Sequence, residues 1–477
     1  MSRTECIDHA SDYFSSGRFL SDLQRRVACP SVSDGAATHE TLTRYLSGEM
    51  TPALQALGFQ CSTVDNAIAG APPMLIARRI ESPDLPTVLS YGHGDVVSGQ
   101  DDRWQAGLEP WRVTCVDQRW YGRGCADNKG QHTINLAGLA AAIHARQGRL
   151  GYNVIVLIEM GEEVGSPGLR ETCAAHATEL RADLFVACDG PRLRAASPTV
   201  FLGSRGAINF TLTLRARDRA YHSGNWGGVL LNPATVIAHA IATLVDARGR
   251  LLVPELRPQR VDPAVRRVLE GVVIGGDVDD PELSPGWGEP GLSPAERLMG
   301  WNTLEVLALG AGSPERPVNA IPALAQAHCQ LRFIAGTPWQ QLPDIIRRHL
   351  SAHGFEGIEV SAGMSAEASR LDPDDPWVDW TCRSIEASSA KTPVVLPNLA
   401  GTLPNDVFTD TLGLPTLWIP HSYPACAQHA PNEHLLADVA HEGLKIMAGL
   451  YWDLGEAGQA PWRRTNDTAT EALRSNR

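Results

Sequence analysis

Short apolar segments alternate with helix-like segments over the first 200 residues of the chain. Thr87–Tyr91, Asn153–Met160 and Asp183–Cys188 are rich in apolar and β-branched residues, and this pattern predicts three buried strands. Gln131–Arg146, between the first two, has the composition of a helix with a basic C-terminal end. Strands that alternate with helices favour an α/β fold, with a mostly parallel sheet between layers of helices.

The pattern changes near Gly203. Ala207–Arg217 and Ala325–Ile334 alternate apolar and polar residues, as half-exposed strands do. Leu252–Trp301, which lies between them, is rich in Pro and Gly and predicts a long surface insertion. This change of pattern predicts a separate, smaller α+β domain.

The strand and helix pattern returns near the end of the chain. Pro415–Pro420 predicts a strand, Glu433–Leu450 predicts a closing helix, and the polar tail after Trp452 is expected to fray. We therefore predict a discontinuous catalytic domain, formed by residues 1–203 and 367–477. The inserted domain is predicted to span residues 204–366.

Composition narrows the class of protein. A chain of 477 residues exceeds one ordinary core, which supports two domains. The net charge of -13 argues against nucleic acid and anionic membranes as partners. No apolar run reaches the ~20 residues that a membrane helix needs, and the N-terminal segment lacks a secretory pattern. Ten scattered cysteines without a C-x-x-C pair predict reduced thiols in a cytoplasmic protein.

Each of the three early strands runs into potential metal ligands. The first is followed by His93 and Asp95, the second by Glu162 and Glu163, and the third by Asp189. In open α/β sheets, ligands bind at the carboxyl ends of the strands. The sequence therefore predicts that these side chains meet at one edge of the sheet.

Two further segments add potential ligands. Asp127 stands just before a predicted helix, and His429 follows the late strand. Each feature alone has an ordinary structural explanation, such as a helix cap for Asp127. Together, imidazole and carboxylate donors without thiolates favour zinc, with manganese or cobalt as alternatives. Because the donors exceed one tetrahedral site, we predict two divalent ions that share a bridging carboxylate.

The order of these segments resembles a known family. It is similar to the metallopeptidases that include carnosine-type dipeptidases, aminoacylases, carboxypeptidase G and succinyl-diaminopimelate desuccinylase, and most similar to the dipeptidase branch. The resemblance spans about residues 85–440 and rests on these stretches in family order: GHGDVV (92–97), YGRGCADNKG (121–130), GEEVGS (161–166), CDG (188–190), RGAINF (205–210), HSGNWGG (222–228), VNAIP (318–322), LRF (331–333), GTLP (401–404) and HAPNEH (429–434).

The resemblance implies roles for the residues at the sheet edge. It implies that His93 and Asp189 bind one metal ion, that Glu163 and His429 bind the other, and that Asp127 bridges both. Glu162 would be the general base, and Asp95 would hold His93 through its second ring nitrogen. The resemblance also implies a cis peptide bond between Asp127 and Asn128.

The resemblance assigns further roles around the inserted domain. His222 would polarise the scissile carbonyl of a site in the partner subunit of a homodimer that pairs through this lid domain. Arg332 would hold the substrate carboxylate, in a pocket lined by Asn319, Gly401 and Thr402. The sequence departs from the carnosine-type pattern here: Ala400–Pro404 replaces Gly-Gly-Ser-Ile-Pro, and Asn319 stands where the family has Thr.

Three classes of function remain open. The first is hydrolysis of dipeptides or small peptides with a free carboxylate, by metal-activated water with Glu162 as base. The second is an amidohydrolase that deacylates N-acyl amino acids or similar conjugates with the same site. The third is a catalytically silent binding protein, which the full set of ligands disfavours. No G-x-S-x-G or H-E-x-x-H motif points to another hydrolytic mechanism.

Overall fold

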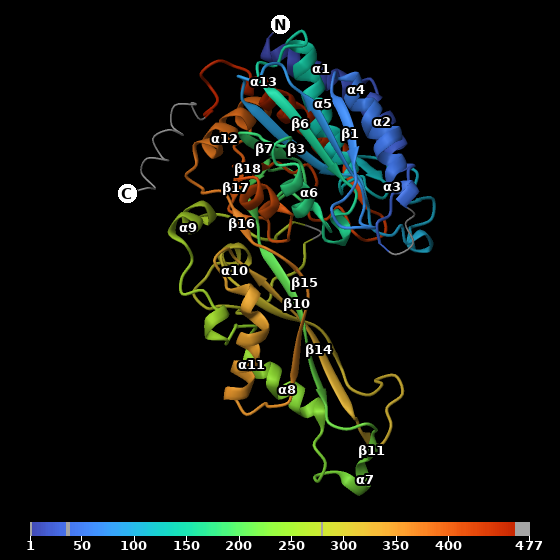
Figure 1. Ribbon diagram of the computed structural model, residues 1–477, viewed down its shortest axis with the longest axis vertical. Helices are drawn as coiled ribbons and strands as arrows, with labels where there is room; N and C mark the ends of the chain where they lie inside the picture. The colour runs from blue at the N-terminus through green and yellow to red at the C-terminus, as the bar shows by residue number, and fades with distance from the viewer. Residues whose placement is uncertain (1, 35–38, 278–279, 463–477) are drawn as a thin grey trace.

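An eight-stranded sheet organises the larger of two domains in the computed structural model, which describes residues 2–34, 39–277 and 280–462 (Figure 1). The strands of this sheet, in spatial order, are β1 (Gln60–Val64), β2 (Met74–Arg79), β6 (Asn153–Glu159), β3 (Thr87–His93), β7 (Leu184–Ala187), β18 (Thr416–Trp418), β8 (Thr199–Phe201) and β17 (Val394–Leu396). The central strands β6, β3, β7 and β18 pair in parallel, whereas β1 and β2 pair antiparallel at one edge. The predicted mostly parallel sheet is confirmed.

Helices cover both faces of this sheet. Along β6, Val154 and Val156 pack into one core, whereas Ile155 and Leu157 pack into another, because successive side chains of a strand point to opposite faces. The first core also contains residues of α1 (Arg3–Ser15), α5 (Lys129–Ala145), α12 (Pro376–Ser389) and α13 (Ala437–Leu454), and the second contains residues of α6 (Leu169–Ala175). The sheet therefore has a rigid layer on each side.

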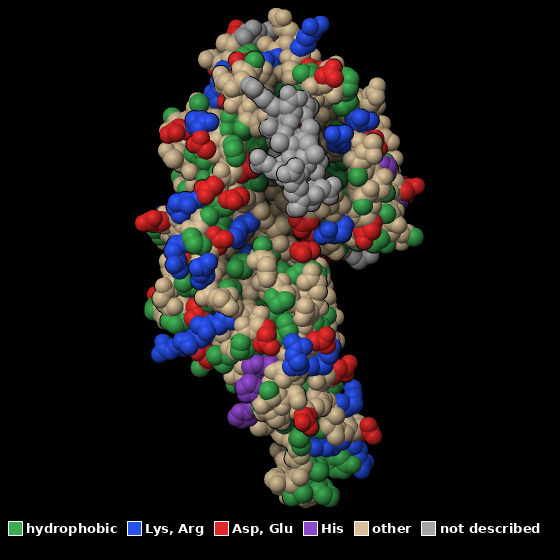
Figure 2. Space-filling model, turned by 60° about the vertical axis from the view of Figure 1, so that its left-hand side comes forward, with side chains coloured by type: hydrophobic (Ala, Val, Ile, Leu, Met, Phe, Trp, Pro, Cys, Tyr) green, Lys and Arg blue, Asp and Glu red, His purple; other side chains and the backbone are tan. Residues whose placement is uncertain are grey.

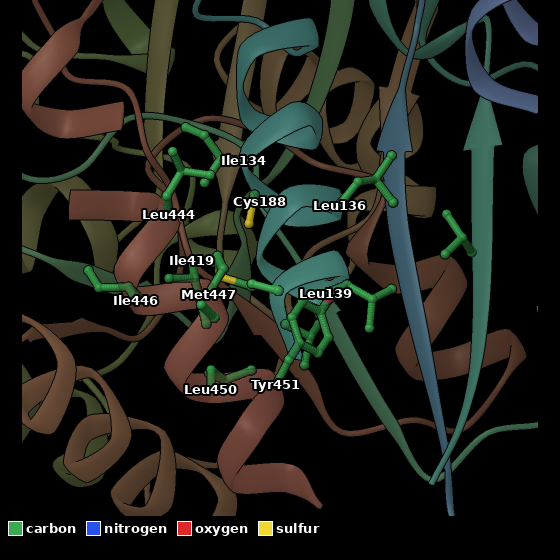
Figure 3. Packing of buried hydrophobic residues seen from close by; sticks show 14 of the residues in the cluster. Ile134, Leu136, Leu139, Cys188, Ile419, Leu444, Ile446, Met447, Leu450 and Tyr451 are labelled. Carbon is green, nitrogen blue, oxygen red and sulfur yellow. The ribbon is translucent and has the colours of Figure 1, made fainter. Parts of the chain in front are cut away.

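The two long helices α5 and α13 pack closely against each other. Figure 3 shows Leu139 of α5 among Met447, Leu450 and Tyr451 of α13. Gly138 permits this approach, because a Cβ atom at this position would overlap Met447. This packing fixes the position of α5, and the loop before α5 carries Asp127.

The Pro- and Gly-rich stretch 252–301 is not simply a surface insertion, so that prediction was wrong. It contains two short helices, α9 (Pro263–Leu269) and α10 (Pro294–Met299). Val265, Met299 and Trp301 are buried and pack into the same core as Ile155 and Leu157 of the large sheet. Its buried apolar residues lie towards its two ends, on either side of the Pro- and Gly-rich segment: Val253, Leu256, Val261, Val265 and Leu269, and then Ala295, Met299 and Trp301.

A second, antiparallel sheet forms an elongated lobe below the larger domain (Figure 1). Its order is β12 (Thr303–Gly310), β14 (Leu324–Phe333), β10 (Gly206–Arg215) and β15 (Glu359–Ala366), and α8 (Pro233–Leu244) and α11 (Leu342–Ala352) pack on it. Side chains alternate between buried and half-buried along β10, as predicted. A small two-stranded antiparallel sheet of β11 (Tyr221–His222) and β13 (Ala320–Ile321), with α7 (Ser223–Trp226), forms the far end of the lobe.

The end of the chain departs from the prediction in one respect. The closing helix α13 begins at Ala437 rather than Glu433, because His434–Leu436 forms strand β19, which pairs with β5 (Arg119–Tyr121). The polar tail predicted to fray falls mainly on residues 463–477, outside the described residues. The remaining elements are α2 (Arg18–Val27), α3 (His39–Tyr45), α4 (Thr51–Ala56), β4 (Thr114–Val116), β9 (Gly203–Ser204) and β16 (Ser369–Arg370).

Within residues 2–34, 39–277 and 280–462, no helix is both long enough and apolar enough to cross a bilayer.

Candidate active site

Three neighbouring parallel strands bring candidate ligands to one edge of the large sheet, as predicted. His93 is the last residue of β3, and Asp189 lies two residues beyond the end of β7. Glu162 and Glu163 begin the turn that follows β6. Because β3 pairs in parallel with both β6 and β7, these carboxyl ends lie side by side.

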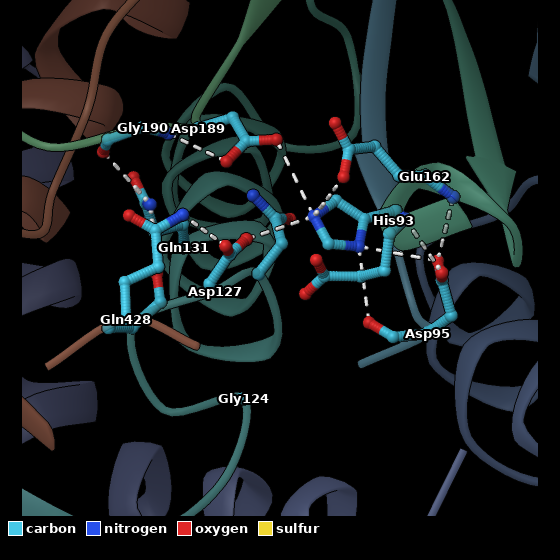
Figure 4. A network of polar contacts seen from close by, with 12 residues as sticks. His93, Asp95, Gly124, Asp127, Gln131, Glu162, Asp189, Gly190 and Gln428 are labelled. Carbon is cyan, nitrogen blue, oxygen red and sulfur yellow. Dashed lines mark hydrogen bonds and ion pairs between the residues drawn. The ribbon is translucent and has the colours of Figure 1, made fainter. Parts of the chain in front are cut away.

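Asp127 connects the two candidate histidines. Its Oδ1 lies 3.0 Å from His93 Nε2, and its Oδ2 lies 3.0 Å from His429 Nε2 (Figure 4 shows the His93 side). Glu163 Oε2 lies 3.0 Å from His429 Nε2, and Asp189 Oδ2 lies 3.6 Å from His93 Nε2. All five predicted ligands therefore converge. The cis peptide bond between Asp127 and Asn128 is also present.

The donors at this cluster fit a divalent cation. One ligand atom each from His93, Asp127 and Glu163 lies within 4.8 Å of the others. Asp189 Oδ2 is buried and has no hydrogen-bond partner among the described residues, so it is available as a ligand. Buried charges are normally paired or bound to a metal ion, and these nitrogen and oxygen donors suit zinc-type ions.

The pKa values reflect crowding of negative charge in a dry site. Burial, together with the charge of Asp127, raises the pKa of Asp189 to about 6 and that of Glu163 to about 7. Burial also raises the pKa of Glu162 well above its usual value. Hydrogen bonds to Asp127 and Glu163 raise the pKa of His429 to about 11. A bound cation would relieve this repulsion between the carboxylates.

Asp95 contacts both His93 and the turn that carries Glu162 and Glu163. Its Oδ1 lies 3.3 Å from His93 Nδ1, which agrees with the expected contact to the second ring nitrogen. Its carboxylate also accepts hydrogen bonds from the backbone N–H groups of Glu162 at 3.2 Å and Glu163 at 3.1 Å. Ser33 donates its hydroxyl to the same carboxylate at 2.7 Å. The fully buried Asp95 therefore fixes the His93 ring and the Glu162–Glu163 turn together.

Glu433 holds the loop that carries Asp127, and the sequence analysis did not identify it. Its buried carboxylate accepts hydrogen bonds from the backbone N–H groups of Gly124 at 3.0 Å, Ala126 at 2.8 Å and Asp127 at 3.1 Å. Arg123 Nη1 pairs with it at 2.7 Å. The only signal in the sequence was its place in the HAPNEH stretch, close to His429.

Gln428 is a second residue that the sequence analysis missed. Its Nε2 donates a hydrogen bond to Asp127 Oδ2, the oxygen that also faces His429. Asp127 is therefore held from several sides, by its backbone N–H and by its carboxylate.

A cleft of about 670 Å³ opens between the cluster and the lobe. Its lining includes Glu162, Glu163 and His429 of the cluster, together with Arg332 of β14 and Thr402. Arg332 Nη1 donates to Thr402 Oγ1 at 2.6 Å, and Gly401 precedes Thr402 in the same loop. A volume of this size suits a small-molecule substrate. The Arg332 guanidinium and carboxylates of the cluster therefore line the same cleft.

His222 and Asn319 lie far from this cleft within the chain. Strand β14 has ten residues, so at about 3.3 Å per residue it separates its two ends by about 30 Å. Arg332 is at the end near the large domain, whereas Asn319 adjoins β13 beyond the other end (Figure 1). Ser223 N donates to Asn319 O at 2.9 Å, which places Asn319 beside the exposed His222. Within one chain, Asn319 therefore does not line the Arg332 pocket.

Comparisons with known proteins agree with this arrangement. Residues 89–453 match the model for "Peptidase family M20/M25/M40". The mouse Beta-Ala-His dipeptidase is 35% identical over 191 residues, which cover 39% of this chain and 38% of that protein. The Cysteinylglycine-S-conjugate dipeptidase of Corynebacterium striatum is 26% identical over 402 residues, which cover 81% of this chain and 83% of that protein.

A solved structure supports the fold. The crystal structure of human carnosine dipeptidase 1 has a TM-score of 0.75 and 22% sequence identity, and the match covers 94% of this chain and 99% of that chain. This likeness confirms the predicted arrangement of an α/β domain with an inserted lobe.

Proposed function

Because the chain belongs to peptidase family M20/M25/M40, we propose that it hydrolyses dipeptides or small peptides that carry a free carboxylate. One observation carries the proposal: a cluster of metal-type ligands and the cation Arg332 face the same cleft. The names of the similar dipeptidases from mouse and Corynebacterium striatum support this choice of substrate. The ten free thiols support the expected cytoplasmic location.

The convergent ligands support a site for two divalent ions, most simply zinc. His93 and Asp189 would hold one ion, Glu163 and His429 the other, and Asp127 both, because its two oxygens face the two histidines. When bound, the ions would acidify a water molecule and polarise the scissile carbonyl. Nitrogen and oxygen donors also accept manganese or cobalt.

Glu162 is placed to move the proton. Its Oε2 is 4.0 Å from His93 Nε2, and it lines the cleft without belonging to the compact group of ligand atoms. It would remove a proton from the attacking water and deliver it to the amide nitrogen as the C–N bond breaks. Asp95 keeps the Glu162 turn in place for this transfer, through the backbone hydrogen bond at 3.2 Å.

Arg332 and Thr402 would bind the substrate carboxylate. The guanidinium side chain lines the cleft, and its hydrogen bonds to Thr402 Oγ1 at 2.6 Å and Gln330 Oε1 at 2.8 Å hold it in one orientation. An oriented guanidinium can form two parallel hydrogen bonds with a carboxylate. Because Arg332 lines the same cleft as Glu162, the substrate carboxylate and the scissile bond would lie in one small cleft.

His222 would act in the partner subunit of a homodimer. Strand β11, which carries it, lies beyond the far end of β14, so His222 cannot reach the cleft of its own chain without a large movement. Hydrophobic side chains gather at the end of the lobe (Figure 2), and Val229 and Val318 there are 75% and 76% exposed. Exposed apolar residues of this kind support a protein interface. Asn319, beside His222, would enter the partner's cleft with it.

Hydrolysis of two substrate panels tests this function. The protein should be loaded with Zn²⁺, Mn²⁺ or Co²⁺ and assayed against dipeptides and N-acetyl amino acids. We expect turnover of dipeptides, complete loss after chelation, and recovery when metal is restored. Turnover restricted to N-acetyl amino acids would establish the amidohydrolase alternative, which uses the same carboxylate contact. Full metal loading without turnover of either panel would contradict both and favour a binding protein.

A further inference from the structure

A second cavity lies on the helical side of the large domain. It has a volume of about 300 Å³ and is formed by α1, α2, α4 and α5, which Figure 1 shows together beside the large sheet. Its wall is largely apolar and contains the following residues: Ala10, Ala53, Leu57, Leu136, Ala137 and Ala140. None of these residues belongs to the cleft that faces the metal ligands. The cavity is therefore separate from the candidate active site.

A buried arginine with an unpaired hydrogen-bond donor among the described residues lines this cavity. Arg26 of α2 is only 4% exposed, and its Nε is buried without a hydrogen-bond partner among the described residues. Its Nη1 donates to Thr133 Oγ1, a neutral acceptor. A buried guanidinium usually has a carboxylate partner, because an unpaired charge in a dry site is costly.

The carboxylate in the cavity wall, that of Asp22, does not pair with the Arg26 guanidinium. Asp22 precedes Arg26 by one helical turn and lines the same cavity. However, Tyr13 donates its hydroxyl to Asp22 Oδ2 at 2.5 Å, and Arg25 Nη1 pairs with Asp22 Oδ1 at 2.7 Å. Within the part of the chain that the structure describes, Arg26 forms no ion pair. The cavity thus combines an available buried cation with an apolar wall.

We propose that this cavity binds a small aliphatic carboxylate. The carboxylate would pair with the Arg26 guanidinium, which offers donors in a planar fork that matches a carboxylate group. The aliphatic body would lie against the alanine and leucine side chains of the wall. A cavity of about 300 Å³ that combines apolar side chains with a few polar groups suits a small ligand of this class. Both a free amino acid and a simple carboxylic acid have this chemistry.

Calorimetry on the metal-loaded, full-length protein tests the proposal with three probes of similar shape. These probes are leucine, 4-methylpentanoate, and 3-methylbutylamine, which has no carboxylate. We expect at least one carboxylate to bind at millimolar concentration or below, and the amine not to bind. Tighter binding of leucine identifies an amino-acid site, tighter binding of 4-methylpentanoate identifies a site for simple acids, and equal binding shows that the carboxylate suffices.

Three variants locate the binding. Arg26→Gln and Ala137→Leu should each weaken carboxylate binding by about tenfold or more, the first by removing the charge and the second by filling the cavity. Arg332→Gln removes the cation that would bind carboxylates in the cleft, so the binding that persists in this variant belongs to the cavity. Thermal unfolding checks that each variant is folded. If Arg26→Gln does not fold, Ala137→Leu still tests the proposal.

Several results would overturn the proposal. These are no carboxylate binding to the wild-type protein, equal binding of the amine, or affinity that survives both Arg26→Gln and Ala137→Leu. Loss of all binding in Arg332→Gln would place the ligand in the cleft instead.

Discussion

At the edge of the large sheet, five candidate ligands meet within one chain. At the far end of the lobe, His222 and Asn319 lie at a distance from that edge. The first group sits on strand ends and loops that buried carboxylates hold from behind, as Asp95 and Glu433 do. The second group lies at a pair of two-residue strands, β11 and β13, beyond the end of the ten-residue strand β14. One chain therefore brings its own candidate ligands together, whereas the role proposed for His222 requires a second chain.

The largest expected effect at the sheet edge is that of Glu162→Gln. Turnover of a dipeptide should fall by about 10²–10⁴-fold, because the group that moves the proton is lost. Metal content, measured by elemental analysis, should stay the same, because Glu162 lies outside the compact ligand group. Glu163→Gln is the matched control and should lower metal content, since Glu163 belongs to that group. Equal metal content and high activity in both variants would refute the assigned roles.

His222→Ala tests the role proposed for the far end of the lobe. Turnover should fall by about 10²-fold, the scale for loss of one donor to a developing oxyanion, with no change in metal content. His239→Ala is a suitable control, because His239 is also an exposed histidine of the lobe but lies on α8. Activity of His222→Ala equal to that of His239→Ala would remove His222 from the mechanism.

Glu433→Gln should give a smaller effect that acts through Asp127. A neutral amide cannot match the three backbone donors and Arg123 as the carboxylate does, so the Asp127 loop should loosen. Metal affinity should fall by about 10–100-fold, as for other residues that orient ligands. Glu289→Gln is the matched control, because Glu289 is also buried and pairs with an arginine, Arg257, in the 252–301 stretch. Equal metal affinity in the two variants would contradict a positioning role.

The sequence predicted the sheet edge well because its signals are local. Apolar runs followed directly by His93, Glu162 and Asp189 mark both the strand and the place where it ends. Parallel pairing then brings those ends together without further information.

The features that the sequence missed depend on tertiary contacts. Glu433 looked like the start of a helix, because the three-residue strand β19 is too short to leave a pattern. Asn319 and Arg332 are close in sequence, but the strand between them is extended and places them at opposite ends of the lobe. Residues of 252–301 become buried because they pack against the large sheet. The Pro and Gly content of this stretch does not indicate that contact.

Mixed dimers test most directly whether the active site is shared between two chains. Glu162→Gln and His222→Ala are each expected to be nearly inactive alone. Mixing the two variants under conditions that exchange subunits should restore part of the activity, because one of the two sites in each mixed dimer then has both Glu162 and His222. Subunit exchange should be verified with two distinguishable tags. Recovery of activity in verified mixed dimers is the result that the shared site predicts, whereas no recovery, or a fully active monomer of the wild-type chain, would contradict it.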